Sequence, residues 1–271
     1  MKTLLPLFLS FLLLASCKQQ TQSTAVLDSI EIIEFTADST TAQPAYSQGA
    51  DRFVVISDII PDILLEIRYY STFNFIGDRI PGYEEPVALL TRPAADSLKA
   101  VSDELRQQGY ILKIYDAYRP QCAVDYFMKW AKDLSDTRMK NYFYPEIEKT
   151  QILPQGYVAS HSGHTRGSTV DLTLFDLNTQ RDVDMGCTFD YFGKASHPGL
   201  QPGEQAGSYP SINKTQYNNR MILRKAMMRH GFRPYENEWW HFTLRNEPFP
   251  KTYFNFPVSL SSVPRVEQPT E

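Results

Sequence analysis

Two histidines and an aspartate lie close together in the stretch Ser160–Leu174, which reads SHSGHTRGSTVDLTL. His164 and Asp171 carry an imidazole and a carboxylate, which are both ligands of zinc. A straight strand of this length would separate them by roughly 23 Å, at about 3.3 Å per residue. One ion can therefore bind both only if the chain bends between them, and Gly167 permits such a bend. The alternative is a polar loop that leads into a strand and binds no metal.

The stretch Glu238–His241, which reads EWWH, supplies a third ligand and a candidate base. A catalytic zinc site needs three protein ligands and leaves a fourth position for water, and His241 would complete the set. Glu238 could hold this water and take its proton. Positions i and i+3 share a face on a helix but not on a straight strand. We therefore expect the two tryptophans in a turn or at the entrance of a strand.

The elements that must position these residues alternate irregularly along the chain. The residue patterns predict a strand, a turn and a strand over 53–70, and strands over 110–116, 168–177 and 238–245. They predict helices over about 93–108, 121–134 and 217–230, with an irregular segment over 135–159. The order lacks regular βαβ spacing. It favours an α+β fold in a single domain, with a mostly antiparallel sheet and flanking helices around the zinc site.

Composition and charge indicate a globular protein that does not bind nucleic acid. The chain has 271 residues, of which 42% are hydrophobic, which is enough for a sizeable core. Its net charge is −4, and no basic run stands out. Nucleic acid is therefore excluded as an expected partner.

Three blocks resemble the signature segments of the VanX-type zinc D-alanyl-D-alanine dipeptidases of peptidase family M15, whose superfamily also holds D,D-carboxypeptidases. The blocks are YDAYRP at 115–120, SGHTRGSTVDLTL at 162–174 and EWWHF at 238–242. The resemblance covers about residues 53–257 and includes RYYSTFNFIG, MGCTFD, ASHPG and NEPFPKTYFNFPV. Each block alone would be weak, but their joint occurrence in order is specific. The resemblance implies one zinc ion per chain, held by His164, Asp171 and His241.

The resemblance also implies roles for residues around the metal. Its general base falls on Glu238, and the arginine that polarises the scissile carbonyl falls on Arg119. Its dipeptide pocket falls on Tyr69, Ser162 and Asp190, with the substrate ammonium near Asp190 and Tyr69. A guanidinium stays charged and can meet a developing oxyanion. A fixed negative charge at Asp190 would distinguish the free α-ammonium of a dipeptide from the amide nitrogen of a longer peptide.

These residues lead to three hypotheses on function. The first is zinc-dependent hydrolysis of D-Ala-D-Ala, or of related D-containing dipeptides, by a metal-bound water with Glu238 as general base, in turnover or salvage of cell-wall peptides. The second is a D,D- or L,D-carboxypeptidase that acts on peptidoglycan stem peptides. The third is a zinc-stabilised wall-binding protein without turnover, which would not need Glu238. The role of Asp190 separates the first two.

The N-terminus reads as a targeting segment. Lys2 precedes an apolar stretch over 4–15 that is too short for a permanent membrane span, and the stretch ends in Leu14–Cys17, which resembles the lipobox of bacterial lipoproteins. This resemblance implies cleavage before Cys17, a lipid on its thiol and a periplasmic enzyme. Lys18, in place of an aspartate, favours the outer membrane. An ordinary secretory signal is the alternative.

We therefore expect four segments. They are a signal peptide over 1–16, a lipidated cysteine and flexible tether over 17–50, the zinc dipeptidase domain over 51–258 and a flexible tail over 259–271. The other two cysteines, Cys122 and Cys187, lie three residues from Arg119 and Asp190. In an exported protein they could form a disulfide that fixes one wall of the pocket. The sequence does not give their separation.

Overall fold

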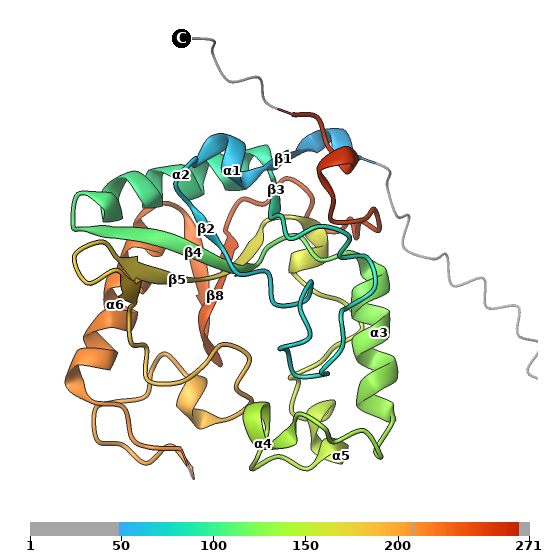
Figure 1. Ribbon diagram of the computed structural model, residues 1–271, viewed down its shortest axis with the longest axis vertical. Helices are drawn as coiled ribbons and strands as arrows, with labels where there is room; N and C mark the ends of the chain where they lie inside the picture. Colours follow the sequence, from blue (N-terminus) through green and yellow to red (C-terminus); the bar gives the residue numbers. More distant parts are fainter. Residues whose placement is uncertain (1–48, 208, 266–271) are drawn as a thin grey trace, which may run out of the picture. The chain divides into compact units, whose positions relative to one another are not determined.

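The computed structural model describes residues 49–207 and 209–265, and these residues form a single α+β domain (Figure 1). The predicted signal peptide, Cys17 and nearly all of the tether lie outside the described residues, as do positions 266–271 of the predicted tail. Over the two described ranges, we find no helix that is both long and apolar enough to cross a membrane.

One sheet carries most of the strands, in the order β2-β4-β5-β8-β7, with β6 beside β5. Only the β2–β4 pair is parallel, so the predicted mostly antiparallel sheet is confirmed. The strands predicted over 110–116, 168–177 and 238–245 are present as β4, β5 and β8, whereas β6 and β7 were not predicted. The bounds are β2 Leu64–Leu65, β4 Tyr110–Asp116, β5 Thr169–Asp176, β6 Arg181–Asp182, β7 Phe232–Tyr235 and β8 Glu238–Leu244.

Three long helices form where the sequence predicts them: α2 Arg92–Arg106, α3 Gln121–Lys132 and α6 Lys214–Arg229. Helices α2 and α6 pack against the sheet, whereas α3 packs against the short helix α5 Lys149–Ile152 (Figure 1). Helix α2 buries Leu98, Val101 and Leu105 on one face. Helix α6 begins three residues earlier than predicted because Asn213 and Gln216 form a reciprocal capping box. Helix α5 and the short helix α4 Lys140–Phe143 lie in the segment predicted as irregular.

The segment 53–70 is the part of the fold that differs most from the prediction. It begins with β1 Phe53–Val55, which pairs with β3 Leu89–Thr91, and continues as the short helix α1 Ile56–Ile59. The second predicted strand is reduced to β2. The amides of Glu66 and Arg68 still donate to β4, to the carbonyls of Ile114 and Tyr115. The chain then turns away, and this turn carries Tyr69 into the core, where it is 1% exposed.

An aromatic cluster lies behind the segment that carries His164. The ring of Phe53 is fully buried and has its centroid 5.0 Å from that of Tyr118 and 4.9 Å from those of Phe254 and Phe256. The backbone beside it is also fixed, because the amide of Phe254 donates to the carbonyl of Thr165. These contacts make a rigid support for the turn His164–Arg166.

Candidate metal centre and active site

The bend expected between His164 and Asp171 is present. His164 begins a 3-10 turn, His164–Arg166, and Gly167 ends it with φ +78° before β5 starts at Thr169. That φ lies in the left-handed region, which favours glycine. The amide of Thr91 on β3 donates to the carbonyl of Gly167 and ties the bend to the neighbouring sheet. The prediction that a glycine bend brings the two side chains together is confirmed.

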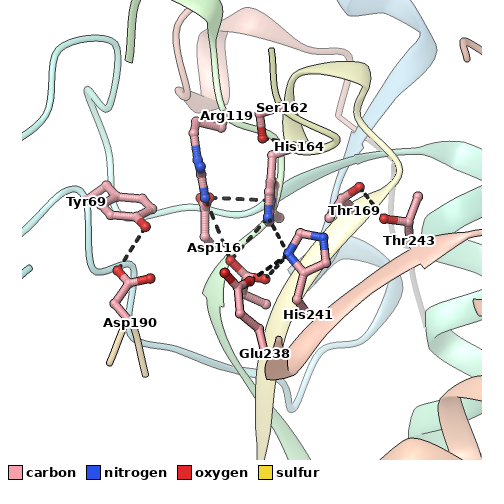
Figure 2. A network of polar contacts seen from close by, with 12 residues as sticks. Tyr69, Asp116, Arg119, Ser162, His164, Thr169, Asp190, Glu238, His241 and Thr243 are labelled. Carbon is pink, nitrogen blue, oxygen red and sulfur yellow. Dashed lines mark hydrogen bonds and ion pairs between the residues drawn. The ribbon is translucent and has the colours of Figure 1, made fainter. Parts of the chain in front are cut away.

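Three potential ligand atoms converge at this point (Figure 2). The Nε2 atom of His164 lies 3.2 Å from Asp171 Oδ2, and the Nδ1 atom of His241 lies 3.0 Å from Asp171 Oδ1. All three ligand atoms lie within 4.8 Å of one another. The Nδ1 atom of His164 is 2.7 Å from the carbonyl of Ala117. A carbonyl oxygen only accepts, so Nδ1 is the donor in this contact and Nε2 is the atom directed at the cluster.

The strand register explains this convergence. Asp171 on β5 lies directly opposite His241 on β8, and on its other side it lies opposite Asp116 on β4. Directly opposed residues of neighbouring strands share a face of the sheet. Three adjacent strands therefore present Asp116, Asp171 and His241 as one row. Two imidazole nitrogens and one carboxylate oxygen fit zinc, which accepts this donor set.

Glu238 joins the cluster through an irregularity in β8. Pro234 of β7 pairs with Phe242, but the next residue, Tyr235, pairs with Glu238, so no residue of β7 lies opposite the three residues between. This break returns Glu238 to the face of His241, with Oε2 3.4 Å from Nδ1. Glu238 is the first residue of its strand, as expected for a strand entrance. Burial raises the pKa of Glu238 to about 7, a value suited to proton transfer near neutral pH.

Arg119 lies on the other side of the cluster and is held by a carboxylate that the sequence reasoning missed. Its Nε and Nη2 atoms lie 2.9 and 2.8 Å from Asp116 Oδ2, and Nη2 lies 3.8 Å from Asp171 Oδ2. Asp116 is fully buried, and its Oδ1 accepts from the Tyr83 hydroxyl at 2.6 Å. Its Oδ2 also lies 3.5 Å from His164 Nδ1. Asp116 thus links the arginine to a candidate ligand.

Tyr69 and Asp190 form a second polar pair at the far side of the site. The Tyr69 hydroxyl donates to Asp190 Oδ2 at 2.9 Å, and both side chains are buried. Asp190 has φ +61°, a left-handed conformation that is uncommon outside glycine. Burial, reinforced by the charge of Asp171, raises the pKa of the Asp190 carboxyl well above its usual value. A cation placed beside it would relieve that penalty.

One cavity of about 220 Å³ unites the predicted residues. All eight of them line it: Tyr69, Arg119, Ser162, His164, Asp171, Asp190, Glu238 and His241. The hydroxyl of Ser162 accepts from the amide of His164, which places it at the start of the turn. Apolar side chains that the sequence reasoning did not assign form the remaining wall: Phe75, Val124, Phe127, Val158 and Phe192. Hydrophobic residues are common in any core, so their types alone give no signal.

The two cysteines do not form the disulfide considered above, and within the described ranges both are free thiols. Cys122 lies on α3, where its thiol is 3.7 Å from the carbonyl of Pro81. Cys187 is buried, and its sulfur accepts from Trp239 Nε1 at 3.4 Å. His161 lines the cavity but stands outside the ligand cluster, with its ring 4.8 Å from that of Tyr253.

Comparison with known proteins identifies the family. A model described as D-ala-D-ala dipeptidase, of the M15 peptidases, matches residues 49–259. The D-alanyl-D-alanine dipeptidase of Enterococcus faecalis is 38% identical over 207 residues, which cover 76% of this chain and 98% of that protein. Proteins of the same name from Enterococcus faecium and Streptomyces coelicolor are 39% and 35% identical, with the same coverage of both chains. This chain therefore belongs to the D-Ala-D-Ala dipeptidase family of M15 peptidases.

Proposed function

We propose that this protein is a zinc-dependent dipeptidase that hydrolyses D-Ala-D-Ala or related D-containing dipeptides. The observation that carries the proposal is one cavity that holds a three-ligand cluster, a carboxylate of raised pKa and an arginine fixed by a buried carboxylate. A volume of about 220 Å³ is below the roughly 300–1,000 Å³ of ordinary small-molecule pockets, and it suits a small substrate. The relatives named above are D-alanyl-D-alanine dipeptidases.

The metal would be held by His164, Asp171 and His241. Bound there, zinc supplies Lewis-acid chemistry and lowers the pKa of a coordinated water. Asp171 suits a cation, because its pKa stays below its usual value although burial alone would raise it. The neighbouring imidazoles of His164 and His241 cause this lowering. Asp171 is thus ionised and ready to bind a cation.

Glu238 and Arg119 would act on the scissile amide from two sides. Glu238 accepts a proton from the attacking water and later delivers it to the leaving amine. A base that must first accept and then release a proton works best with a pKa near the working pH, and the value of about 7 meets this need. Arg119 keeps its charge and donates to the carbonyl oxygen as negative charge develops there. Asp116 holds the guanidinium in place for this contact.

Asp190 and Tyr69 would select the substrate by its free α-ammonium. A buried carboxylate with a raised pKa gains most from a full positive charge, and an amide nitrogen offers none. The aromatic and aliphatic wall leaves room for small side chains such as methyl groups. The second candidate, a carboxypeptidase for stem peptides, would need an extended substrate whose amide nitrogen lies at this carboxylate.

The test is a hydrolysis panel on the purified protein. The substrates are D-Ala-D-Ala, L-Ala-D-Ala, L-Ala-L-Ala and a stem pentapeptide, each with and without added zinc. We expect zinc-dependent cleavage of D-Ala-D-Ala, an intact pentapeptide and no turnover by Glu238→Ala. Cleavage of the pentapeptide would move the protein to the carboxypeptidases. Zinc binding without cleavage of any substrate would leave a binding protein.

We also propose that the protein is exported and carries a lipid at Cys17, with the enzyme in the periplasm and turnover or salvage of wall peptides as its setting. The support is the sequence alone: Lys2, the apolar stretch over 4–15 and the lipobox-like Leu14–Cys17. Labelling with radioactive palmitate tests it. Label that is absent from the intact protein, or unchanged in Cys17→Ala, would refute the lipid anchor.

A further inference from the structure

Arg220 is a buried cation that the proposed chemistry does not use. It lies on α6, and its side chain is among the largest that the domain buries, with 1% exposure. Within the described part of the chain, no carboxylate forms an ion pair with it; four polar atoms of one irregular segment, residues 185–197, surround it instead. Burial lowers its pKa. A buried charge without a carboxylate partner lowers stability unless its N–H donors are hydrogen-bonded. The contacts of Arg220 with this segment therefore keep its charge tolerable inside the domain.

The contacts join both ends of the segment 185–197. The Nε atom donates to the carbonyl of Met185 at 2.6 Å, and Nη1 donates to that of His197 at 3.2 Å. Nη2 donates to the carbonyl of Ala195 at 2.9 Å and to the sulfur of Cys187 at 3.6 Å. The segment contains only a short 3-10 turn, Lys194–Ser196, so its own backbone does little to fix its path. One guanidinium therefore closes this loop.

The loop is shaped to fit this side chain. Gly186 has φ +89°, and a Cβ atom there would lie 3.3 Å from Arg220 Nη2 and 2.7 Å from Ile212 Cγ2. The guanidinium also lies 5.9 Å from the ring centroid of Trp239, a neighbour of Glu238 on β8. Arg220 thus lies between the loop and the strand that carries the candidate base.

We propose that Arg220 is a positioning residue for Asp190, and through it for recognition of the substrate ammonium. Asp190 lies between the two anchored ends of the loop, in a left-handed conformation that its surroundings must maintain. Its carboxylate must also stay within reach of the Tyr69 hydroxyl. Arginine suits this task because its planar group offers five donors in a fixed geometry, which lysine cannot reproduce. The link to the ammonium rests on the proposed function.

The experiment compares Arg220→Lys and Arg220→Met with Arg229→Met in the full chain. Arg229 is a matched control, because it lies on the same helix but is exposed and pairs with Glu104. The first readout is alkylation of Cys187 in the folded protein, located by peptide mass mapping. The second is kcat and KM for D-Ala-D-Ala, together with the preference for it over N-acetyl-D-Ala-D-Ala. Thermal melting shows which variants are folded.

We expect both Arg220 variants to alkylate at Cys187 faster than the parent. In the folded variants KM should rise at least about tenfold, as losses of supporting contacts do, while kcat changes little. The preference for the free dipeptide should fall, and Arg229→Met should match the parent throughout. Unchanged Cys187 reactivity in Arg220→Lys, or a loss of kcat at constant KM, would overturn the proposal.

Asp190→Asn separates this inference from the proposed function. If Asp190→Asn keeps the preference for the free dipeptide, the ammonium role of Asp190 is wrong. The reactivity of Cys187 then still decides whether Arg220 holds the loop. If Asp190→Asn loses the preference and Arg220→Lys keeps it, the carboxylate acts without help from Arg220, and the positioning role fails.

Discussion

The bend at Gly167 gives the sharpest mechanical prediction, for the substitution Gly167→Ala. An added Cβ would lie 2.2 Å from Phe53 Cε1, 2.3 Å from Cζ and 3.1 Å from Thr91 Cγ2. The Phe53 ring cannot move aside easily, because it is fully buried and three aromatic rings pack around it. The substitution therefore combines a strained backbone with an overfilled core.

The two contributions can be given magnitudes. A left-handed conformation costs a residue with a Cβ about 1–2 kcal/mol, and overpacking of a core costs about 1–3 kcal/mol. We expect Gly167→Ala to lower the free energy of unfolding by about 2–5 kcal/mol. Gly203 is the control, since its φ is +79° and a Cβ there meets nothing within 4 Å. Gly203→Ala should lose only the backbone contribution.

Urea unfolding of the parent and both variants measures these losses, and the difference between the variants isolates the clash with Phe53. Zinc affinity, measured by competition with a chromogenic chelator, should also fall in Gly167→Ala, because the bend aligns His164 with Asp171. It should stay unchanged in Gly203→Ala. Equal losses of stability in the two variants would refute the role assigned to the Phe53 contact.

Three further predictions concern the polar residues. Asp116→Asn should destabilise the fold by about 3 kcal/mol, since it removes the buried member of the ion pair and leaves the largely buried Arg119 without its closest carboxylate. The value of kcat/KM should also fall, while zinc content, measured by plasma mass spectrometry, stays at the parent level. Glu238→Gln should keep its zinc and lose turnover by about 10²–10⁴-fold, and full activity in this variant would exclude Glu238 as the base. Burial raises the pKa of Tyr144 to about 12. The buried neutral tyrosine therefore contributes stability below pH about 10, where the tyrosine of the unfolded chain is also neutral. This stability is lost as the pH rises from about 10 towards 12. Urea unfolding at rising alkaline pH checks this last prediction, and Tyr144→Phe should show a weaker decline.

Local features explain what the sequence could predict. The helices α2, α3 and α6 have apolar residues at helical spacing, and the bend at Gly167 follows from the need to bring two nearby ligands together. The spacing of Glu238 and His241 likewise requires a departure from a straight strand. These inferences depend on residues close together in the chain, so local geometry is sufficient for them.

Features that depend on the pairing of distant segments were not predicted. Asp116 lies in the same row as Asp171 only because the register of β4 against β5 shifts between Ile114 and Asp116. Arg220 is far in sequence from the carbonyls of Met185 and Ala195, and an arginine on a helix usually faces solvent. The helix α1 replaced a predicted turn because the pattern of apolar residues over 53–70 does not distinguish a short helix from a strand.

The register of Asp171 opposite His241 has a consequence for the lifetime of the protein. These residues belong to β5 and β8, and beyond β8 lies only the edge strand β7. An ion bound between them would fasten the β7–β8 hairpin to the rest of the sheet, and metal that binds only the folded state stabilises it by mass action. Loss of the ion would favour local opening at this edge, and locally opened segments are where proteases cut. The supply of metal around the protein would then set how long each molecule survives, in addition to how fast it works.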